Sequence, residues 1–334
     1  MIVPARNEAA RIGELLRSLQ VQTVSPGEVI VANDDSTDET ASVAAAWGAQ
    51  VLQVPPRPEN WTGKSWACDR GAAAATGDVL LFLDADVVLG PQALERLPSA
   101  CAHSAGGVVS VQPYHRIVKP YESYSALFNL QVIASIGIGH GARGLFGPCI
   151  MIAAADYERC GGHAAIRESV VDDIALGAVC RTNGVAIHTY LGGTTMWFRM
   201  YEEGPRQMLT GWTKNFLQGA GATPRHILFA QAMWIVGAAT AAVQLPLAAA
   251  GLAIGIVPLH LAVGAYLGYV VLLTAVLPRH GNFGVSTAFL FPLHVAFFAV
   301  VTVSALWIRI RGGSVSWRGR EVTPHPRGDV ERRV

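Results

Sequence analysis

Two carboxylates interrupt an apolar run in the sequence VLLFLDADVVLG, residues 79–90. An ionised carboxylate taken out of water destabilises a fold unless a cation or a hydrogen-bond donor meets it. In an extended segment residues i and i+2 point the same way, so Asp84 and Asp86 can direct their oxygens into one site. Mg²⁺ or Mn²⁺ accepts such oxygen ligands and bridges them to a diphosphate. Taken alone, a D-x-D pair is common, and a solvated turn at a strand end is then the simpler explanation.

Strand-like and helix-like segments alternate around this pair. The segments IVP, EVIVAND, AQVLQVP and VLLFLDAD read as strands, and apolar residues recur at helical spacing between the first two, at Ile12, Leu15, Leu16 and Leu19. Ser36 and Glu39 fit a capping box for a second helix that ends at Gly48, and residues 65–75 fit a third. This alternation predicts an α/β fold with a mostly parallel sheet and helices on both faces. Ligands in such sheets bind beyond the carboxyl ends of the strands, where both aspartates lie.

The second half of the chain is far more apolar. No Asp, Glu, Lys or Arg occurs in residues 227–278 or 281–308, and only 15% of the whole chain is charged. A membrane helix needs about 20 apolar residues, so these runs fit three spans, or two spans plus a kinked or re-entrant segment near Pro246 and Pro258. The alternative is the helical core of a soluble domain, although such helices usually keep a polar face. We therefore expect a catalytic domain over 1–221, transmembrane helices over 222–310 and a basic tail over 311–334.

The charge distribution predicts orientation and excludes some partners. Lys214 and Arg225 precede the apolar runs and an arginine-rich tail follows them, so the positive-inside rule places both in the cytoplasm after an even number of crossings. A net charge of +1 gives no basic field for a nucleic acid. The five cysteines form no CxxC pair, which indicates reduced thiols in a cytosol-facing domain. The opening residues contain no apolar signal-peptide core, so we expect no cleavable signal there.

Five motifs occur in a fixed order: VPARNEAARI, VANDDSTDET, GKSWACDRG, LFLDADV and VVDDIALG. This ordered set resembles the family 2 glycosyltransferases, inverting enzymes with a GT-A nucleotide-sugar-binding domain, and the resemblance covers about residues 2–221. It implies a UDP-sugar donor and Mg²⁺ or Mn²⁺ as cofactor. One departure is NDDS, where an order of acid, acid, glycine and serine is commoner in the family, so Asn33 takes a usually acidic place and Asp35 a usual glycine place.

The resemblance also implies roles for particular residues. Asp34 matches the acid that bonds the uracil base, Lys64 the loop near the diphosphate, and Asp69 a position more often held by Asn. Asp86 matches the direct metal ligand, while Asp84 contacts the ribose or the outer metal shell. The implied nucleotide-sugar residues are Pro4, Arg6, Glu8, Asn33, Asp34, Lys64, Asp69 and Asp84.

The last motif supplies two candidates for the catalytic base. Asp173 matches the second acid of the family's acidic pair, which is the base, but this chain has Asp at both places and the choice between Asp172 and Asp173 stays open. Asp172 also fits the N-cap of a helix that closes at Gly184. Capping therefore explains Asp172, and it does not explain a second acid at Asp173.

The stretch before the apolar runs concerns the acceptor. Trp212, Arg199 and Lys214 are candidates for covering the acceptor and steadying the leaving diphosphate, or are headgroup anchors. The sequence QMLTGW lacks the arginine of the Q-x-x-R-W motif of processive synthases, which favours transfer of a single sugar. The pattern RMY…GW.KN…GA is similar to the carotenoid-acid glycosyltransferases.

That similarity implies an integral enzyme of the cell membrane that moves a sugar, with glucose as the first choice, to a lipid acceptor such as a carotenoid acid. Polyprenyl-phosphate, hopanoid and glycolipid acceptors are alternatives, and a processive synthase is less favoured. A non-enzymatic transporter is disfavoured too, because the apolar runs hold no ionisable residue except His260 and His294. Residues 126–139 and 143–151 are candidates for either the acceptor entrance or buried core.

Overall fold

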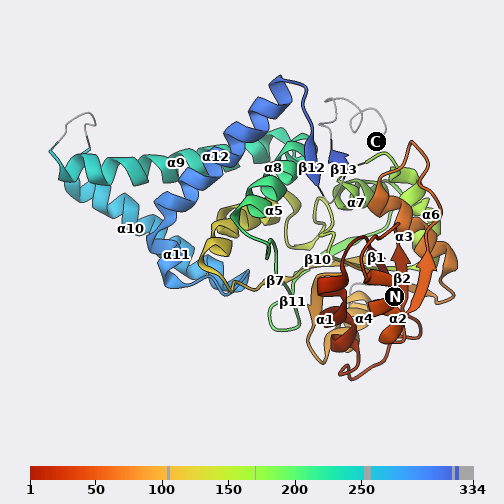
Figure 1. The fold of residues 1–334 in the computed structure, drawn as a ribbon. Coiled ribbons are helices and arrows are strands. Elements are labelled where there is room, and N and C mark those ends of the chain that lie inside the picture. Colours follow the sequence, from red (N-terminus) through yellow and green to blue (C-terminus); the bar gives the residue numbers. More distant parts are fainter. Residues whose placement is uncertain (104–105, 170, 252–256, 318–319, 323–334) are drawn as a thin grey trace. The chain divides into compact units, whose positions relative to one another are not determined.

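The computed structural model describes residues 1–334 except 104–105, 170, 252–256, 318–319 and 323–334 (Figure 1). The chain forms two compact units. The α/β unit contains Met1–Tyr114 and Ile136–Arg199, and the helical unit contains His115–Ser135 and Met200–His325. Residues 1–221, the predicted catalytic domain, thus contribute to both units.

An eight-stranded sheet forms the centre of the α/β unit, in the order β3-β2-β1-β4-β9-β6-β10-β8. Only β9 and β8 run against the other strands, which confirms the expected mostly parallel sheet. The strands are β1 (Ile2–Ala5), β2 (Ile30–Asn33), β3 (Gln50–Gln53), β4 (Val79–Leu83), β6 (Val108–Gln112), β8 (Gly139–His140), β9 (Cys149–Ala153) and β10 (Ile187–Leu191). A smaller sheet has the order β5 (Val87–Leu89), β11 (Met196–Phe198) and β7 (Tyr114–His115), and β5 and β11 run antiparallel in it.

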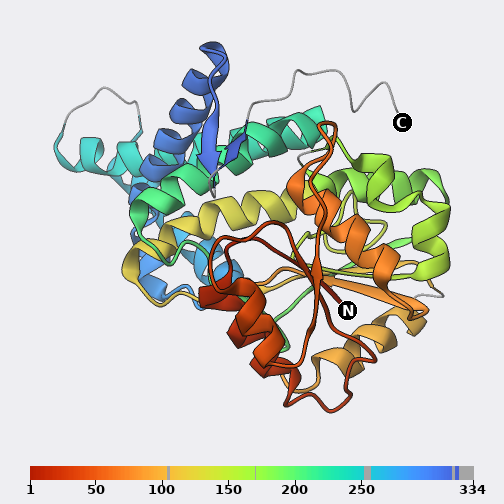
Figure 2. The same ribbon diagram turned by 45° about the vertical axis from the view of Figure 1, so that its right-hand side comes forward.

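Alternating side chains of the strands enter two separate cores. Val3, Leu81 and Leu83 pack with helices α1 (Ala9–Leu19) and α4 (Ala93–His103), whereas Ile2, Leu80 and Phe82 pack with α3 (Gly63–Ala74) and α7 (Asp172–Thr182). Figure 2 shows helices on both sides of this sheet. The helices of the unit are α1 (Ala9–Leu19), α2 (Thr40–Ala46), α3 (Gly63–Ala74), α4 (Ala93–His103), α6 (Ala154–Arg159), η2 (Gly162–Ile166) and α7 (Asp172–Thr182). Since both faces are covered, the strands read as nearly continuous apolar runs.

Two predicted helix starts are wrong. Helix α2 begins after Glu39, which takes the N-cap position, and Ser36 Oγ instead accepts a hydrogen bond from the Asn7 N–H at 3.0 Å. Helix α7 begins at Asp172 itself, with Val171 at the N-cap, so Asp172 does not cap the helix. The predicted helix ends hold, because Gly48 and Gly184 follow their helices with φ of 81° and 71°.

Among the described residues, the helical unit contains three helices long and apolar enough to cross a membrane: α9 (Arg225–Ala249), α10 (Leu259–Val276) with its extension to Arg279, and α12 (Phe291–Ile310). Between 11% and 33% of each apolar window is buried, which favours membrane spans over the helical core of a soluble domain. The elements of the unit are η1 (Pro120–Ser125), α5 (Ala126–Ile136), α8 (Pro205–Ala222), α9 (Arg225–Ala249), α10 (Leu259–Val276), η3 (Leu277–Arg279), α11 (Val285–Phe289), α12 (Phe291–Ile310), β12 (Val315–Trp317) and β13 (Arg320–Val322).

Candidate active site

Two loops meet at the carboxyl ends of β1 and β2. The Asn7 side-chain oxygen accepts the Thr37 N–H at 2.8 Å, and the Glu8 N–H donates to Thr40 Oγ1 at 2.8 Å. Asn7 and Asp35 have φ of 53° and 55°. Asn and Asp tolerate this left-handed region better than other side chains, which explains how Asp35 fills a usual glycine place.

Four of the predicted nucleotide residues, Arg6, Glu8, Asn33 and Asp34, lie at this edge. Arg6 donates to the Asp34 carbonyl at 2.8 Å and lies 3.6 Å from the Asp35 carboxylate. Asn33 is buried and donates to Gln53 Oε1 at 2.8 Å, while its own amide oxygen has no protein partner. Glu8 is buried and is paired with Arg11 at 3.2 Å.

Lys64 brings a cation to the aspartates that follow β4. Thr62 caps α3 by accepting the Ser65 N–H, and this places Lys64 in the first turn with its Nζ 2.6 Å from Asp84 Oδ1. Burial alone lowers the pKa of Lys64, but the charges of Asp84 and Asp172 outweigh it and hold the pKa well above its usual value. Lys64 therefore remains an ammonium group between two acidic motifs.

Asp86 is half-buried beside Asp84, just before β5. Burial, together with the charge of Asp84, raises the pKa of Asp86 to about 7, against the opposing charges of Arg11 and Lys64. A divalent cation favours the ionised form of such a carboxylate, so the pair fits a metal. Across the described residues, His, Cys, Asp and Glu form no cluster of three that could hold a metal by protein ligands alone. Phosphate oxygens and water would have to complete the coordination.

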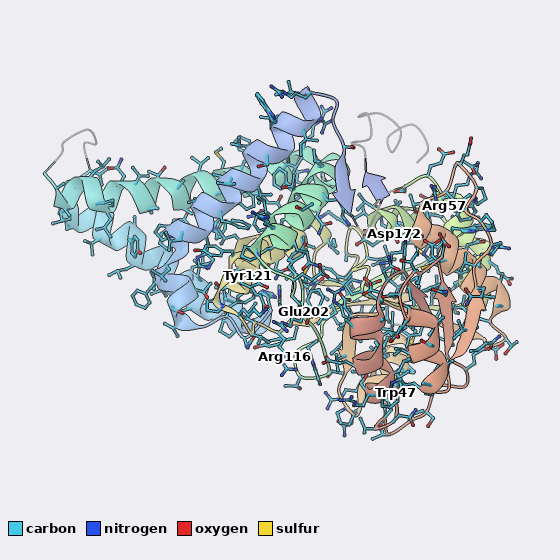
Figure 3. The ribbon with its side chains drawn as sticks, viewed as in Figure 1. Trp47, Arg57, Arg116, Tyr121, Asp172 and Glu202 are labelled. Carbon is cyan, nitrogen blue, oxygen red and sulfur yellow. The ribbon has the colours of Figure 1, made fainter. Side chains whose placement is uncertain are left out.

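Asp173 lies in the first turn of α7, next to Asp172, which is labelled in Figure 3. Its Oδ1 accepts the Ile174 N–H at 2.8 Å and its Oδ2 accepts the Gly147 N–H at 3.2 Å. Burial, and then the charge of Asp172, raises the pKa of Asp173 to about 6. A carboxylate held this way is ionised at neutral pH and still basic enough to take a proton.

Asp69 has a neighbouring partner. Arg70 donates to its carboxylate through Nε at 3.0 Å, and the same guanidinium lies over the Trp66 ring, 4.6 Å from the ring centroid. Besides burial, the charge of Asp69 contributes to raising the pKa of the buried Cys68 thiol, and it partly opposes the lowering of the pKa of the buried His163.

Trp212 belongs to the packed core of the helical unit. Its ring stacks on Phe128 with centroids 4.6 Å apart, its Nε1 donates to Ser125 Oγ at 3.0 Å, and only 3% of the residue is exposed. This burial favours a packing role for Trp212 over either headgroup anchoring or acceptor contact. Lys214 lies on α8 in the same unit, whereas Arg199 is the last described residue of the α/β unit.

Backbone groups complete the site, and the sequence analysis missed them. The Asp84 N–H donates to the Pro148 carbonyl at 3.0 Å, and the Thr62 N–H donates to the Arg167 carbonyl at 2.8 Å. Residues 143–151 were candidates for an acceptor entrance, yet Leu145 and Phe146 are almost fully buried. The only sequence signal was the Gly-Pro pair in RGLFGPCIM, which indicates a turn without saying what it contacts.

Comparisons with known proteins agree with this geometry. The model of "Glycosyl transferase family 2" matches residues 1–173. A 4,4'-diaponeurosporenoate glycosyltransferase of Staphylococcus aureus strain MRSA252 is 34% identical over 96% of this chain and 87% of its own length, and its namesake from strain USA300 is 35% identical over the same shares. The fold is also similar to that of the mannosyltransferase PcManGT from Pyrobaculum calidifontis, solved with GDP-Man and Mn²⁺, with a TM-score of 0.56, 22% identity and coverage of 92% of this chain and 86% of that one. The chain belongs to glycosyl transferase family 2.

Proposed function

We propose that this chain transfers one hexose, with glucose as the first candidate, from a UDP-sugar to a carotenoid acid in the membrane, inverting the anomeric configuration. The similarity to the diaponeurosporenoate enzymes carries the proposal, because it extends over 96% of the chain and so includes the apolar helices. A relationship confined to the α/β unit would support only a sugar-nucleotide donor.

The donor side of the proposal rests on the edge formed by β1, β2 and β4. Asp34 and Asn33 hold the base and Arg6 supports their loop, with Pro4 and Glu8 at its border. Lys64 attracts the diphosphate, because the charges of Asp84 and Asp172 keep its ammonium group protonated. The diphosphate brings further negative charge, so this side needs an additional cation.

Asp86 and Asp84 would hold that cation, Mg²⁺ or Mn²⁺. The bound ion would neutralise charge that develops on the leaving diphosphate. Asp86 is the stronger ligand candidate, because one oxygen of Asp84 already faces Lys64 at 2.6 Å. The raised pKa of Asp86 supports this choice, since a crowded carboxylate gains most from a nearby cation.

Asp173 acts on the acceptor. As the acceptor oxygen bonds to the anomeric carbon and the bond to the diphosphate breaks, Asp173 accepts the acceptor proton and UDP leaves. A carboxylic acid acceptor is already ionised at neutral pH, so for this class Asp173 orients the acceptor and little proton transfer is needed. Arg199, Lys214 and Trp212 remain candidates for contacts to the acceptor or the diphosphate.

The helical unit supports a lipid acceptor. Phe229 on α9, Val271 on α10 and Val303 on α12 are 66%, 68% and 66% exposed. Apolar side chains exposed in this way favour a bilayer as their surroundings. A long apolar acid dissolved in that bilayer would be available to an enzyme anchored in it.

Mass spectrometry of lipid extracts from cells with and without the gene tests the proposal. We expect a pigment heavier by one hexose only when the gene is present, and purified protein should release UDP from UDP-glucose in a metal-dependent way. A glycosylated polyprenyl phosphate or hopanoid in place of the pigment would change the acceptor, and a polymer would restore the synthase alternative. Absence of any glycosylated lipid or UDP release would refute the proposal.

We also propose that the α/β unit and the C-terminus both face the cytoplasm. Lys214, Arg225 and Arg309 support this through the positive-inside rule, which requires an even number of crossings. Helix α9 is the least apolar candidate, with a mean hydropathy of 1.6 against 2.0 for the other two, so we expect it not to cross. A reporter inserted after Gly251 should then be active in the cytoplasm, as should one at the C-terminus. A C-terminal reporter active only outside the cell would overturn this topology.

A further inference from the structure

The segment Phe146–Pro148, which enters β9, contacts both acidic motifs of the candidate site. The Gly147 N–H donates to Asp173 Oδ2 at 3.2 Å, and the neighbouring Pro148 carbonyl accepts the Asp84 N–H at 3.0 Å. Two consecutive residues therefore contact the proposed base, Asp173, and the motif that contains Asp84. We call Phe146–Pro148 the bridging segment.

The bridging segment is fixed to the sheet on both sides. Ser110, in the middle of β6, is fully buried; its Oγ accepts the Phe146 N–H at 2.6 Å and lies 2.9 Å from the Phe146 carbonyl, to which it donates. On the other side Cys149 begins β9 and pairs with Leu83, the residue directly before Asp84. Because the segment is held at both ends, it has little freedom to relax. A shift of one end therefore moves the groups that the other end contacts.

Gly147 leaves no spare room beside Asp173. A Cβ added there would lie 3.2 Å from Asp173 Oδ2 and 3.4 Å from Asp173 Cβ. Asp173 cannot easily yield, since its other oxygen is bonded to the Ile174 N–H. Gly144, three residues earlier, differs: a Cβ there would meet Ile174 Cα at 3.5 Å, which is ordinary van der Waals contact.

We infer that the bridging segment sets the spacing between the Asp84–Asp86 pair and Asp173, and that Gly147 is the positioning residue for Asp173. The inference rests on the proposed function and adds a residue to its machinery. Gly147 touches no reacting atom; it acts by aiming the Asp173 carboxylate. A glycine serves here because the carboxylate approaches the backbone more closely than a side chain permits.

The test compares Gly147→Ala with Gly144→Ala in the full-length protein in detergent or vesicles. Water should serve as acceptor, because UDP-glucose hydrolysis requires proton removal whatever the natural acceptor is. We expect Gly147→Ala to lower kcat on the order of tenfold with unchanged binding of UDP, since small misplacements of a catalytic group have effects of this size. Gly144→Ala should remain within about twofold of the wild type, because its Cβ meets only ordinary contacts.

A pH profile separates positioning from general damage. The Gly147 N–H lowers the pKa of Asp173, so a longer hydrogen bond moves the acidic limb of kcat to higher pH. Part of the activity lost in Gly147→Ala should therefore return as the pH is raised. Ser110→Ala, which releases Phe146 without touching Asp173, should shift the limb in the same direction by a smaller amount, and it serves as the test if Gly147→Ala does not fold.

The outcomes are distinguishable. Equal kcat in Gly147→Ala and Gly144→Ala, with an active wild type, overturns the inference alone. So does a loss in Gly147→Ala that is the same at every pH. A wild-type protein that neither hydrolyses UDP-glucose nor transfers glucose refutes the proposed function, whatever the variants do.

Discussion

An acidic cluster in the α/β unit and a hydrogen-bonded cluster in the helical unit hold their polar groups in opposite ways. In the α/β unit Asp86 and Asp173 are crowded by neighbouring acids, so their pKa values rise to about 7 and about 6. In the helical unit the Tyr121 hydroxyl lies 2.9 and 3.1 Å from the Tyr201 and Glu202 carbonyls (Figure 3), and Trp212 is equally well paired. Crowded acids lower stability and are kept where chemistry needs them, whereas satisfied hydrogen bonds contribute to packing.

The largest expected effect comes from Asp86. Asp86→Asn should lower turnover by orders of magnitude while the protein stays folded, because an amide is a weak ligand and cannot balance the charge of a divalent cation. UDP release from UDP-glucose at saturating Mn²⁺ measures it. Asp156→Asn is the matched control, since Asp156 lies outside the cluster and pairs with Arg159 at 2.7 Å. Near-normal activity of Asp86→Asn, or full wild-type activity in excess EDTA, would remove the metal assignment.

The next effect separates the two acids of α7. Asp173→Asn should collapse hydrolysis while leaving UDP binding intact, because a base acts in the transition state and contributes little to donor affinity. Asp172→Asn should be mild, since an amide at the first helical position disturbs little beyond the local charge. With a carboxylic acid acceptor the Asp173→Asn effect on transfer should shrink.

Product analysis completes that comparison. NMR of the product should show a β-linked sugar from the α-linked donor. The wild-type rate of hydrolysis should fall as the pH drops through about 6, where Asp173 becomes protonated. A retained α-linkage, or greater damage from Asp172→Asn, contradicts the choice of Asp173.

The sequence predicts those site residues that lie in short contiguous motifs. The carboxylates after β4 follow from an apolar run that ends in D-x-D, and the parallel sheet follows from the alternation of elements. The Gly147 N–H could not be predicted, because a backbone donor has no residue signature and its partner lies 26 positions away. The start of α2 was misplaced because Ser36 bonds to Asn7 in another loop, a tertiary contact that overrides the local capping pattern.

Membership of the helical unit was equally hidden. Residues 115–135 join the helical unit although the α/β unit resumes at Ile136. The sequence indicates either acceptor contact or headgroup anchoring for Trp212, because Trp and Lys near an apolar run are typical of membrane interfaces. Its stacking on Phe128 depends on a partner from this separate segment, which no local pattern indicates.

A smaller effect concerns stability and has the opposite sign to the loss of activity. The pKa of Asp86 rises from 3.8 to about 7 on folding, so the native state binds its proton more readily and the free energy of unfolding falls as the pH rises through this window. Without metal, Asp86→Asn should therefore melt a few degrees above the wild type at pH 8, and the difference should shrink as the pH falls and vanish below 3.8. Mn²⁺ should raise the melting temperature of the wild type and not that of the variant. A lower melting temperature for Asp86→Asn at pH 8 would show that Asp86 is not a crowded charge.

The smallest effect tests the other side of the comparison, the satisfied hydrogen bond of Trp212. Trp212→Phe keeps an aromatic ring against Phe128 but removes the donor to Ser125 Oγ, which is fully buried. A double-mutant cycle with Ser125→Ala isolates that bond, and we expect a coupling of about 1 kcal/mol in the free energy of unfolding. If Trp212 only packs, kcat and the KM for the lipid acceptor stay within about twofold of the wild type, since the loss of one core hydrogen bond changes stability and leaves the site unaltered. A rise in the acceptor KM without loss of stability means that the ring contacts the acceptor. The helical unit would then contribute to the reaction at this residue as well as to packing.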